Sequence, residues 1–119
     1  MLLEYENLLA LANRQSRRGL MADFSTSATA VNASCGDECT VWLKIADDEI
    51  VDVSFETKGC VISRASAAAI SDAVIGPIGQ IGLMNGNSIR SLLGVAVSPL
   101  RERCLTTPLK ALQDAISKL

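Results

Sequence analysis

The sequence predicts an α+β fold in which helices cover one small antiparallel sheet. Between residues 40 and 55, apolar and polar side chains alternate with a period of two around Asp47 and Asp48, which is typical of a β-hairpin. By contrast, the two ends of the chain carry leucines at helical spacing, over 2–13 and over 105–119. A chain of 119 residues can bury a core of its own, and we expect one domain over 1–119.

The first half of the chain predicts a helix followed by strands. The helix over 2–13 contains no Gly or Pro and ends at a polar break. This break holds Arg14, Arg17 and Arg18, which we expect to form a solvated loop and not a docking patch. A short strand is predicted over 27–31, before the hairpin. One face of the hairpin is expected to be buried. Its residues are Val41, Leu43, Ile45, Val51, Val53 and Phe55.

The second half is mainly helical. The stretch 61–75 is rich in alanine and is followed by Gly76-Pro77, a common stop signal for a helix. Glycines interrupt 76–98, where a short helix is predicted over 87–93. The last helix is predicted to begin near Cys104 or later, or to kink, because Pro108 cannot donate a backbone hydrogen bond.

Composition excludes several classes of protein. Apolar residues make up 49% of the chain and aromatic residues only 3%, so the core must be mostly aliphatic. The net charge of −2, without a basic stripe, argues against nucleic-acid binding. No run approaches the roughly 18 apolar residues of a membrane span. Glu4 and Glu6 stand where a secretory signal would be basic, so we expect a cytoplasmic protein with reduced cysteines.

The chain contains no histidine. This absence excludes Ser-His and Cys-His nucleophile pairs, HExxH zinc sites and imidazole bases within one chain. A tight transition-metal site must therefore be built from Cys, Asp and Glu.

Three cysteines, distant in the sequence, occupy the ends of predicted elements. Cys35 precedes the first strand of the hairpin, Cys60 follows the second strand at the start of a helix, and Cys104 begins the last helix. An antiparallel hairpin returns to its starting point, so Cys35 and Cys60 are brought to the same end of the sheet. A single cysteine is most often a small buried apolar residue. Three at element ends instead indicate metal ligands or reactive groups.

Asp37 follows Cys35 by two residues and could be a turn residue or a hard oxygen ligand. Three sulfurs and one carboxylate suit zinc, and thiolates also bind iron-sulfur clusters. Cys39 is expected to be structural, and the competing hypothesis is an all-cysteine zinc site that uses Cys39 in place of Asp37.

Arg101 and Arg103 flank Cys104. They are either a solvated helix start or cations that stabilise a thiolate and an anionic persulfide. Cys60 stands at the start of a predicted helix, where free amides and the positive end of the helix dipole favour a thiolate over a thiol.

Three motifs, in order along nearly the whole chain, resemble the U-type iron-sulfur cluster assembly proteins. This is the family of SufU, IscU and the N-terminal domain of NifU. The motifs are Asn32-Ala33-Ser34-Cys35-Gly36-Asp37, Lys58-Gly59-Cys60 with Ile62-Ser63-Arg64-Ala65-Ser66-Ala67, and Arg101-Glu102-Arg103-Cys104 with Leu109-Lys110-Ala111-Leu112. Within the family the chain is most similar to SufU, because Arg103 stands where IscU carries histidine. The stretch between Cys60 and Cys104 is too short for the usual SufU insertion.

The resemblance implies a metal site at one exposed end of the sheet, with Cys35, Asp37, Cys60 and Cys104 as ligands for zinc or a 2Fe-2S cluster. It also implies two kinds of partner: a pyridoxal-phosphate cysteine desulfurase that hands over persulfide sulfur, and apo iron-sulfur proteins. The implied sulfur acceptor is Cys35 in SufU-like members and Cys104 in IscU-like members, with Arg101 as the stabilising cation. Such a protein is a sulfur acceptor and not a stand-alone enzyme.

Three functional hypotheses follow from the sequence. The first is metal-dependent sulfur transfer, in which a thiolate attacks the persulfide and needs no histidine base. The second is a scaffold that assembles a 2Fe-2S cluster and hands it over. The third, from another class, is a structural zinc domain that only binds a protein partner.

Overall fold

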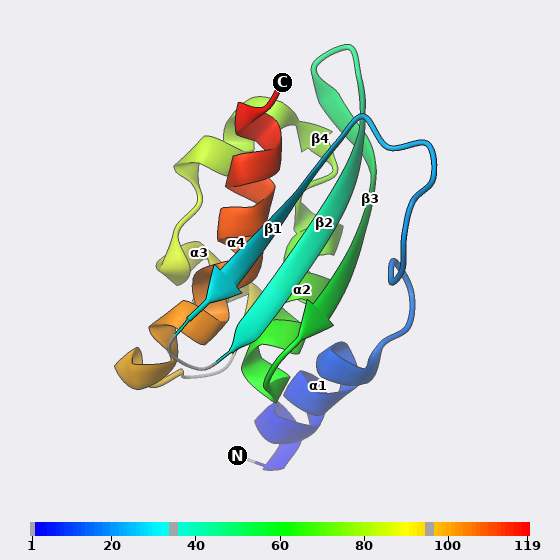
Figure 1. Cartoon of the computed structure of the whole chain (residues 1–119). Coiled ribbons are helices and arrows are strands. Elements are labelled where there is room, and N and C mark those ends of the chain that lie inside the picture. Colours follow the sequence, from blue (N-terminus) through cyan, green and yellow to red (C-terminus); the bar gives the residue numbers. More distant parts are fainter. Residues whose placement is uncertain (1, 34–35, 95–96) are drawn as a thin grey trace.

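A four-stranded antiparallel sheet in the order β1-β2-β3-β4 forms one layer of the molecule (Figure 1). The computed structural model of the chain describes residues 2–33, 36–94 and 97–119. The strands are β1 (Thr26–Asn32), β2 (Asp37–Ala46), β3 (Glu49–Lys58) and β4 (Gly76–Pro77). The turn between β2 and β3 consists of Asp47 and Asp48, both at positive φ as a two-residue hairpin turn requires. The predicted hairpin is confirmed.

The helices lie mainly on one face of this sheet (Figure 1). They are α1 (Leu2–Asn13), α2 (Val61–Ala73), α3 (Gly86–Leu93) and α4 (Glu102–Ser117), with 3-10 helices η1 (Ile78–Leu83) and η2 (Pro99–Arg101). α4 packs on β1 and β2, α2 packs on β3 and on α4, and α1 packs on α2. The α+β class, with helices covering a small antiparallel sheet, is therefore confirmed. Within the described residues, no helix is long and apolar enough to cross a lipid bilayer.

The buried face of the hairpin differs from the prediction at one strand end. Val53 and Phe55 are buried as expected, but Ile50 is buried in place of Val51, which is exposed. The register explains this difference, because Lys44 pairs with Asp52 while the next residue pairs with Ile50. A β-bulge leaves one extra residue in β3 and reverses the alternation beyond it.

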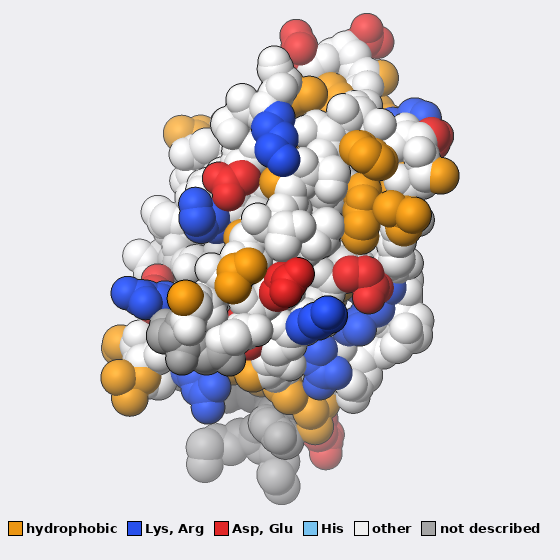
Figure 2. All heavy atoms as spheres, in the orientation of Figure 1, with side chains coloured by type: hydrophobic (Ala, Val, Ile, Leu, Met, Phe, Trp, Pro, Cys, Tyr) orange, Lys and Arg blue, Asp and Glu red, His pale blue; other side chains and the backbone are white. Residues whose placement is uncertain are grey.

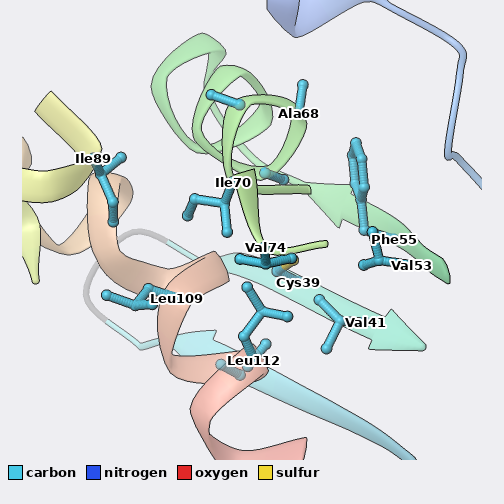
Figure 3. Close-up of a cluster of buried hydrophobic side chains, with 14 of the residues drawn as sticks. Cys39, Val41, Val53, Phe55, Ala68, Ile70, Val74, Ile89, Leu109 and Leu112 are labelled. Atoms are coloured by element: carbon cyan, nitrogen blue, oxygen red, sulfur yellow. The ribbon is translucent and has the colours of Figure 1, made fainter. Parts of the chain in front are cut away.

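The core between the sheet and the helices is almost entirely aliphatic, as the composition predicts. Phe55 is the largest fully buried side chain among those whose burial the structure describes, and Cys39 is buried beside the aliphatic residues of α2 and α4 (Figure 3). The aliphatic side chains labelled there are Val41, Val53, Ala68, Ile70, Val74, Ile89, Leu109 and Leu112.

The arginine-rich break after α1 is half-buried, and the prediction of a solvated loop there is wrong. Arg14 forms a 2.6 Å ion pair with Asp72 of α2 and donates a hydrogen bond to the carbonyl of Ala68. Arg18 lies over the ring of Phe55, with 5.8 Å between its guanidinium carbon and the ring centroid. These contacts fix the end of α1 against α2 and the edge of β3.

The last helix begins two residues before Cys104, at Glu102. Pro108 therefore lies inside α4, where it has no amide hydrogen to donate to the carbonyl of Cys104. The side chain of Thr106 donates to the carbonyl of Glu102 in the same turn. The first turn of α4 thus forms in spite of the proline.

Candidate metal centre

Three side chains predicted to be ligands gather at the end of the sheet where α2 and α4 begin. Asp37 is the first residue of β2, Cys60 is the N-cap of α2, and Cys104 lies in the first turn of α4. One ligand atom from each, a carboxylate oxygen and two sulfurs, lies within 4.8 Å of the other two.

The hairpin register brings Asp37 and Cys60 together. Glu38 pairs with Lys58, the last residue of β3. Asp37, the residue before Glu38, therefore faces the residues that follow β3. The amide of Cys60 donates a 3.3 Å hydrogen bond to Asp37 Oδ1, and Cys60 Sγ lies 3.9 Å from Asp37 Oδ2. Asp37 is thus a strand residue, which disagrees with the interpretation as a turn residue and leaves that of an oxygen ligand.

The packing of α2 against α4 brings Cys104 to the same place. Ser66 of α2 is buried and donates a 2.6 Å hydrogen bond to the carbonyl of Leu105, the neighbour of Cys104. This bond joins the two helix starts directly. It explains how a residue so far along the chain reaches Cys60.

Gly59 allows the close approach of the chain to the Asp37 carboxylate. A Cβ atom at position 59 would lie 2.8 Å from Asp37 Cγ and 2.6 Å from Ser63 Oγ. Carbon atoms do not approach other atoms so closely without displacing them. Any residue larger than glycine would therefore push against the candidate ligand.

Ser63 is a member of the site that sequence reasoning missed. Its hydroxyl is fully buried, donates a 3.1 Å hydrogen bond to the carbonyl of Cys60, and lies 3.9 Å from Cys60 Sγ. The available signal was a serine in the first turn of the helix that Cys60 begins, since such hydroxyls often bond back to the backbone.

The gathered side chains fit a bound metal ion. Asp37 is 3% exposed and Cys104 is 4% exposed, whereas Cys60 is half-buried. A buried carboxylate is costly unless a cation or several donors compensate its charge. Among the described residues, no lysine or arginine forms an ion pair with Asp37. One oxygen and two sulfurs are ligands that zinc and iron-sulfur clusters accept.

Cys35, the remaining predicted ligand, lies outside the described residues. Its role as a ligand and as the sulfur acceptor stays a prediction from the sequence.

Cys39 is not a member of this group. It belongs to the core (Figure 3). It is fully buried, and burial raises the pKa of its thiol from 9.0 to about 12. The structure therefore favours the structural interpretation of Cys39 over a site in which it replaces Asp37.

Arg101 and Arg103 lie on different sides of the site. Arg101, in η2, lines a hollow of about 330 Å³ together with Cys60. Arg103 lines a second hollow, of about 380 Å³, together with Asn32 at the end of β1. The sequence linked both arginines to Cys104 alone, whereas Arg101 lines the same hollow as Cys60.

The outer face of the sheet shows no continuous basic stripe among the described residues. Figure 2 shows Lys and Arg side chains interspersed with acidic and apolar ones over this face.

Comparison with known proteins identifies the family. The model of the NifU-like N-terminal domain matches residues 5–119. The chain belongs to this family. Its sequence relatives include the iron-sulfur cluster assembly scaffold protein IscU of Thermotoga maritima, 42% identical over 71 residues, and the zinc-dependent sulfurtransferase SufU of Bacillus subtilis, 31% identical over 105 residues. The resemblance inferred from the three motifs is confirmed.

The matches cover different shares of these proteins. The match to the T. maritima protein covers 60% of this chain and only 50% of that protein. The match to SufU covers 73% of this chain and 71% of SufU. Relatives named IscU and SufU both occur, so these matches establish the NifU-like family as a whole.

Solved structures have the same fold. A protein of Fervidobacterium islandicum, described as an iron-sulfur cluster assembly scaffold for the SUF system, superposes with a TM-score of 0.79 at 28% identity. The superposition covers 93% of this chain and 94% of that one. The N-terminal part of a nitrogen-fixing NifU-like protein of Brucella abortus, at 20% identity and a TM-score of 0.79, shares the fold.

Proposed function

We propose that this chain is an iron-sulfur cluster assembly protein that accepts persulfide sulfur at a metal site. The proposed ligands are Cys35, Asp37, Cys60 and Cys104, and the proposed donor is a pyridoxal-phosphate cysteine desulfurase. The observation that carries the proposal is the convergence of Asp37, Cys60 and Cys104 from three separate elements within 4.8 Å. Kinship with a zinc-dependent sulfurtransferase supports the choice of zinc.

The chemistry asks little of the protein beyond thiolates and a cation. Bound zinc would keep the liganding thiols deprotonated at neutral pH. A thiolate attacks the outer sulfur of a persulfide without a general base, which suits a chain that has no histidine. Arg101, at the rim of the hollow beside Cys60, would attract an anionic persulfide.

A cysteine desulfurase assay tests this function. The full chain, loaded with zinc, should increase sulfide release by the desulfurase under reducing conditions. Cys35→Ala and Asp37→Ala should remove the increase. Sulfide release that is the same with and without the chain would contradict the proposal.

A scaffold function is the second candidate, because relatives of this chain are named IscU assembly scaffold proteins. In this case the same residues would hold a 2Fe-2S cluster as cargo for apo iron-sulfur proteins. Anaerobic reconstitution with iron and sulfide distinguishes the two functions. A stable visible absorbance would favour the scaffold, whereas tight zinc binding without a cluster would favour sulfur transfer.

A further inference from the structure

The gathered ligands differ in their access to solvent. Asp37 and Cys104 are buried, whereas Cys60 is half-buried at the start of α2. A reagent that arrives from outside therefore reaches Cys60 before Cys104.

The hollow of about 330 Å³ has Cys60 in its lining. Its walls are Leu8 of α1, Val61 and Ile62 of α2, and Val97, while Ser98 and Arg101 form its polar part. The second hollow, of about 380 Å³, lies beside Arg103 and has none of Asp37, Cys60 and Cys104 in its lining. Among the described candidate ligands, only Cys60 lines either hollow.

The chemistry of the first hollow matches one kind of ligand. Apolar walls accept an aliphatic stem, and the guanidinium of Arg101 favours an anion at the end of that stem. Cys60 is also the N-cap of a 13-residue helix, whose positive end favours negative charge. An alkyl persulfide has this composition, with a short carbon chain and an anionic terminal sulfur.

We propose that sulfur enters the site at Cys60, from an alkyl persulfide that binds in the hollow lined by Val61, Ile62 and Arg101. This inference rests on the proposed function and names a first acceptor other than the Cys104 implied for IscU-like members. Cys35, the acceptor implied for SufU-like members, lies outside the described residues. The Cys60 thiolate attacks the outer sulfur of the donor persulfide. A new sulfur-sulfur bond forms on Cys60, the donor's sulfur-sulfur bond breaks, and the donor leaves as a thiolate. No external oxidant or reductant is needed.

The position of the transferred sulfur can be measured directly. The zinc-loaded full chain is mixed briefly with free cysteine persulfide, or with a persulfide-loaded cysteine desulfurase, then alkylated and digested with trypsin. Cleavage after Lys and Arg places Cys60 in peptide 59–64 and Cys104 in peptide 104–110, with Cys35 and Cys39 in 19–44. We expect the added sulfur to appear first on peptide 59–64. Transfer from both donors shows that the hollow admits small persulfides, whereas transfer from the desulfurase alone restricts it to protein donors.

Two other outcomes separate the inference from the proposed function. Added sulfur that appears first on 104–110 or 19–44 would overturn Cys60 as the entry point and leave the sulfur-transfer function standing. Added sulfur on no peptide, from either donor, would overturn both.

A matched pair of variants tests the route and keeps every proposed ligand. Val61→Trp fills the hollow beside Cys60, whereas Val31→Trp fills the hollow beside Arg103. Val61→Trp should slow the labelling of Cys60 about tenfold or more, and Val31→Trp should leave it unchanged. If Val31→Trp slowed the labelling of Cys60 and Val61→Trp did not, while both variants bound zinc equally, the route would be overturned.

Arg101→Gln tests the charge without blocking the hollow. It should slow alkylation of Cys60 by anionic iodoacetate several-fold and leave alkylation by neutral iodoacetamide unchanged. A loss of fold would alter both rates together. If the variant and the wild type reacted at the same rate with iodoacetate, and also with iodoacetamide, Arg101 would have no part in the proposal.

Discussion

Gly59 determines how closely the junction of β3 and α2 approaches Asp37. Because a Cβ at this position would lie 2.8 Å from Asp37 Cγ, Gly59→Ala must displace the carboxylate or the backbone. We expect a loss of about 1 to 3 kcal/mol in the free energy of unfolding, typical of overpacking, and weaker zinc binding. Urea unfolding and a zinc competition titration would measure the two effects.

Gly79→Ala is the matched control, since a Cβ at position 79 would meet no atom within 4 Å. Its unfolding free energy should stay within about 0.5 kcal/mol of the wild type. If Gly59→Ala behaved like Gly79→Ala in both measurements, the close packing of Asp37 against position 59 would be contradicted.

The raised pKa of the Cys39 thiol predicts that the free energy of unfolding falls at alkaline pH. Burial raises the pKa of this thiol from 9.0 to about 12, so between these values the unfolded chain loses the proton while the folded chain keeps it. The stabilisation that Cys39 provides is complete below pH 9 and is lost as the pH rises toward 12, by at most about 1.4 kcal/mol per pH unit.

Cys39→Ala isolates this effect, because every other group titrates equally in the two proteins. The variant should be less stable than the wild type near neutral pH, owing to the cavity that it leaves, and the difference should shrink above pH 9. A difference that stays constant with pH would show that Cys39 ionises normally. Zinc binding should be unaffected, since Cys39 is not in the gathered group.

The structural role of single residues could be predicted only in part from the sequence. The general burial of cysteine correctly favoured Cys39 as a core residue. The half-buried contacts of Arg14 and Arg18 were not predictable, because their partners on α2 and β3 are distant in the sequence. A run of arginines has the same local pattern whether solvent or another element surrounds it.

At the scale of elements, an ion pair joins α3 to the start of α4. Arg90 of α3 pairs with Glu102, two residues before Cys104, and the Glu102 side chain lies over Gly86. Glu102→Gln should lower zinc affinity several-fold, because the first turn of α4 is no longer fixed. The loss of stability should stay below about 1 kcal/mol, since both side chains are partly solvated.

Asp114→Asn provides the control within the same helix. Its partner Lys110 lies one turn away and is largely exposed, and Asp114 is partly solvated. This variant should change neither zinc affinity nor stability appreciably. If Glu102→Gln lowered stability but left zinc affinity intact, the ion pair would support the fold without positioning Cys104.

Most elements were predictable from local patterns. The short strand over 27–31 and the short helix over 87–93 lie within β1 and α3 as predicted, beside the longer helices and the hairpin. The two-residue strand β4 exists only because Gly76 and Pro77 pair with the start of β3, and no local signal announces such pairing. The bulge that exposes Val51 also depends on register, which one strand alone does not reveal.

At the scale of the whole molecule, the candidate site joins three regions of the chain. Hairpin geometry alone predicted that the segment before β2 would meet Cys60, and Asp37 and Cys60 do lie together. The approach of Cys104 depends on the packing of α2 against α4, including the bond from Ser66 to Leu105. Such long-range packing cannot be read from periodicity. The position of Cys104 at an element end and the family resemblance both pointed to it.

A metal at this site would cross-link β2, α2 and α4, so the stability of the whole molecule should depend on zinc. At a free zinc concentration of about one hundred times the dissociation constant, binding to the folded state adds about 2.7 kcal/mol, or roughly 10 °C in Tm. Removal of the metal with a chelator should reverse this gain.

Asp37→Asn keeps the size of the side chain but removes its charge, and should abolish most of the shift in Tm. Asp114→Asn, in the C-terminal half of α4 and outside the gathered group, should retain it. A Tm that does not respond to zinc in the wild type would show that Asp37, Cys60 and Cys104 gather without binding the metal.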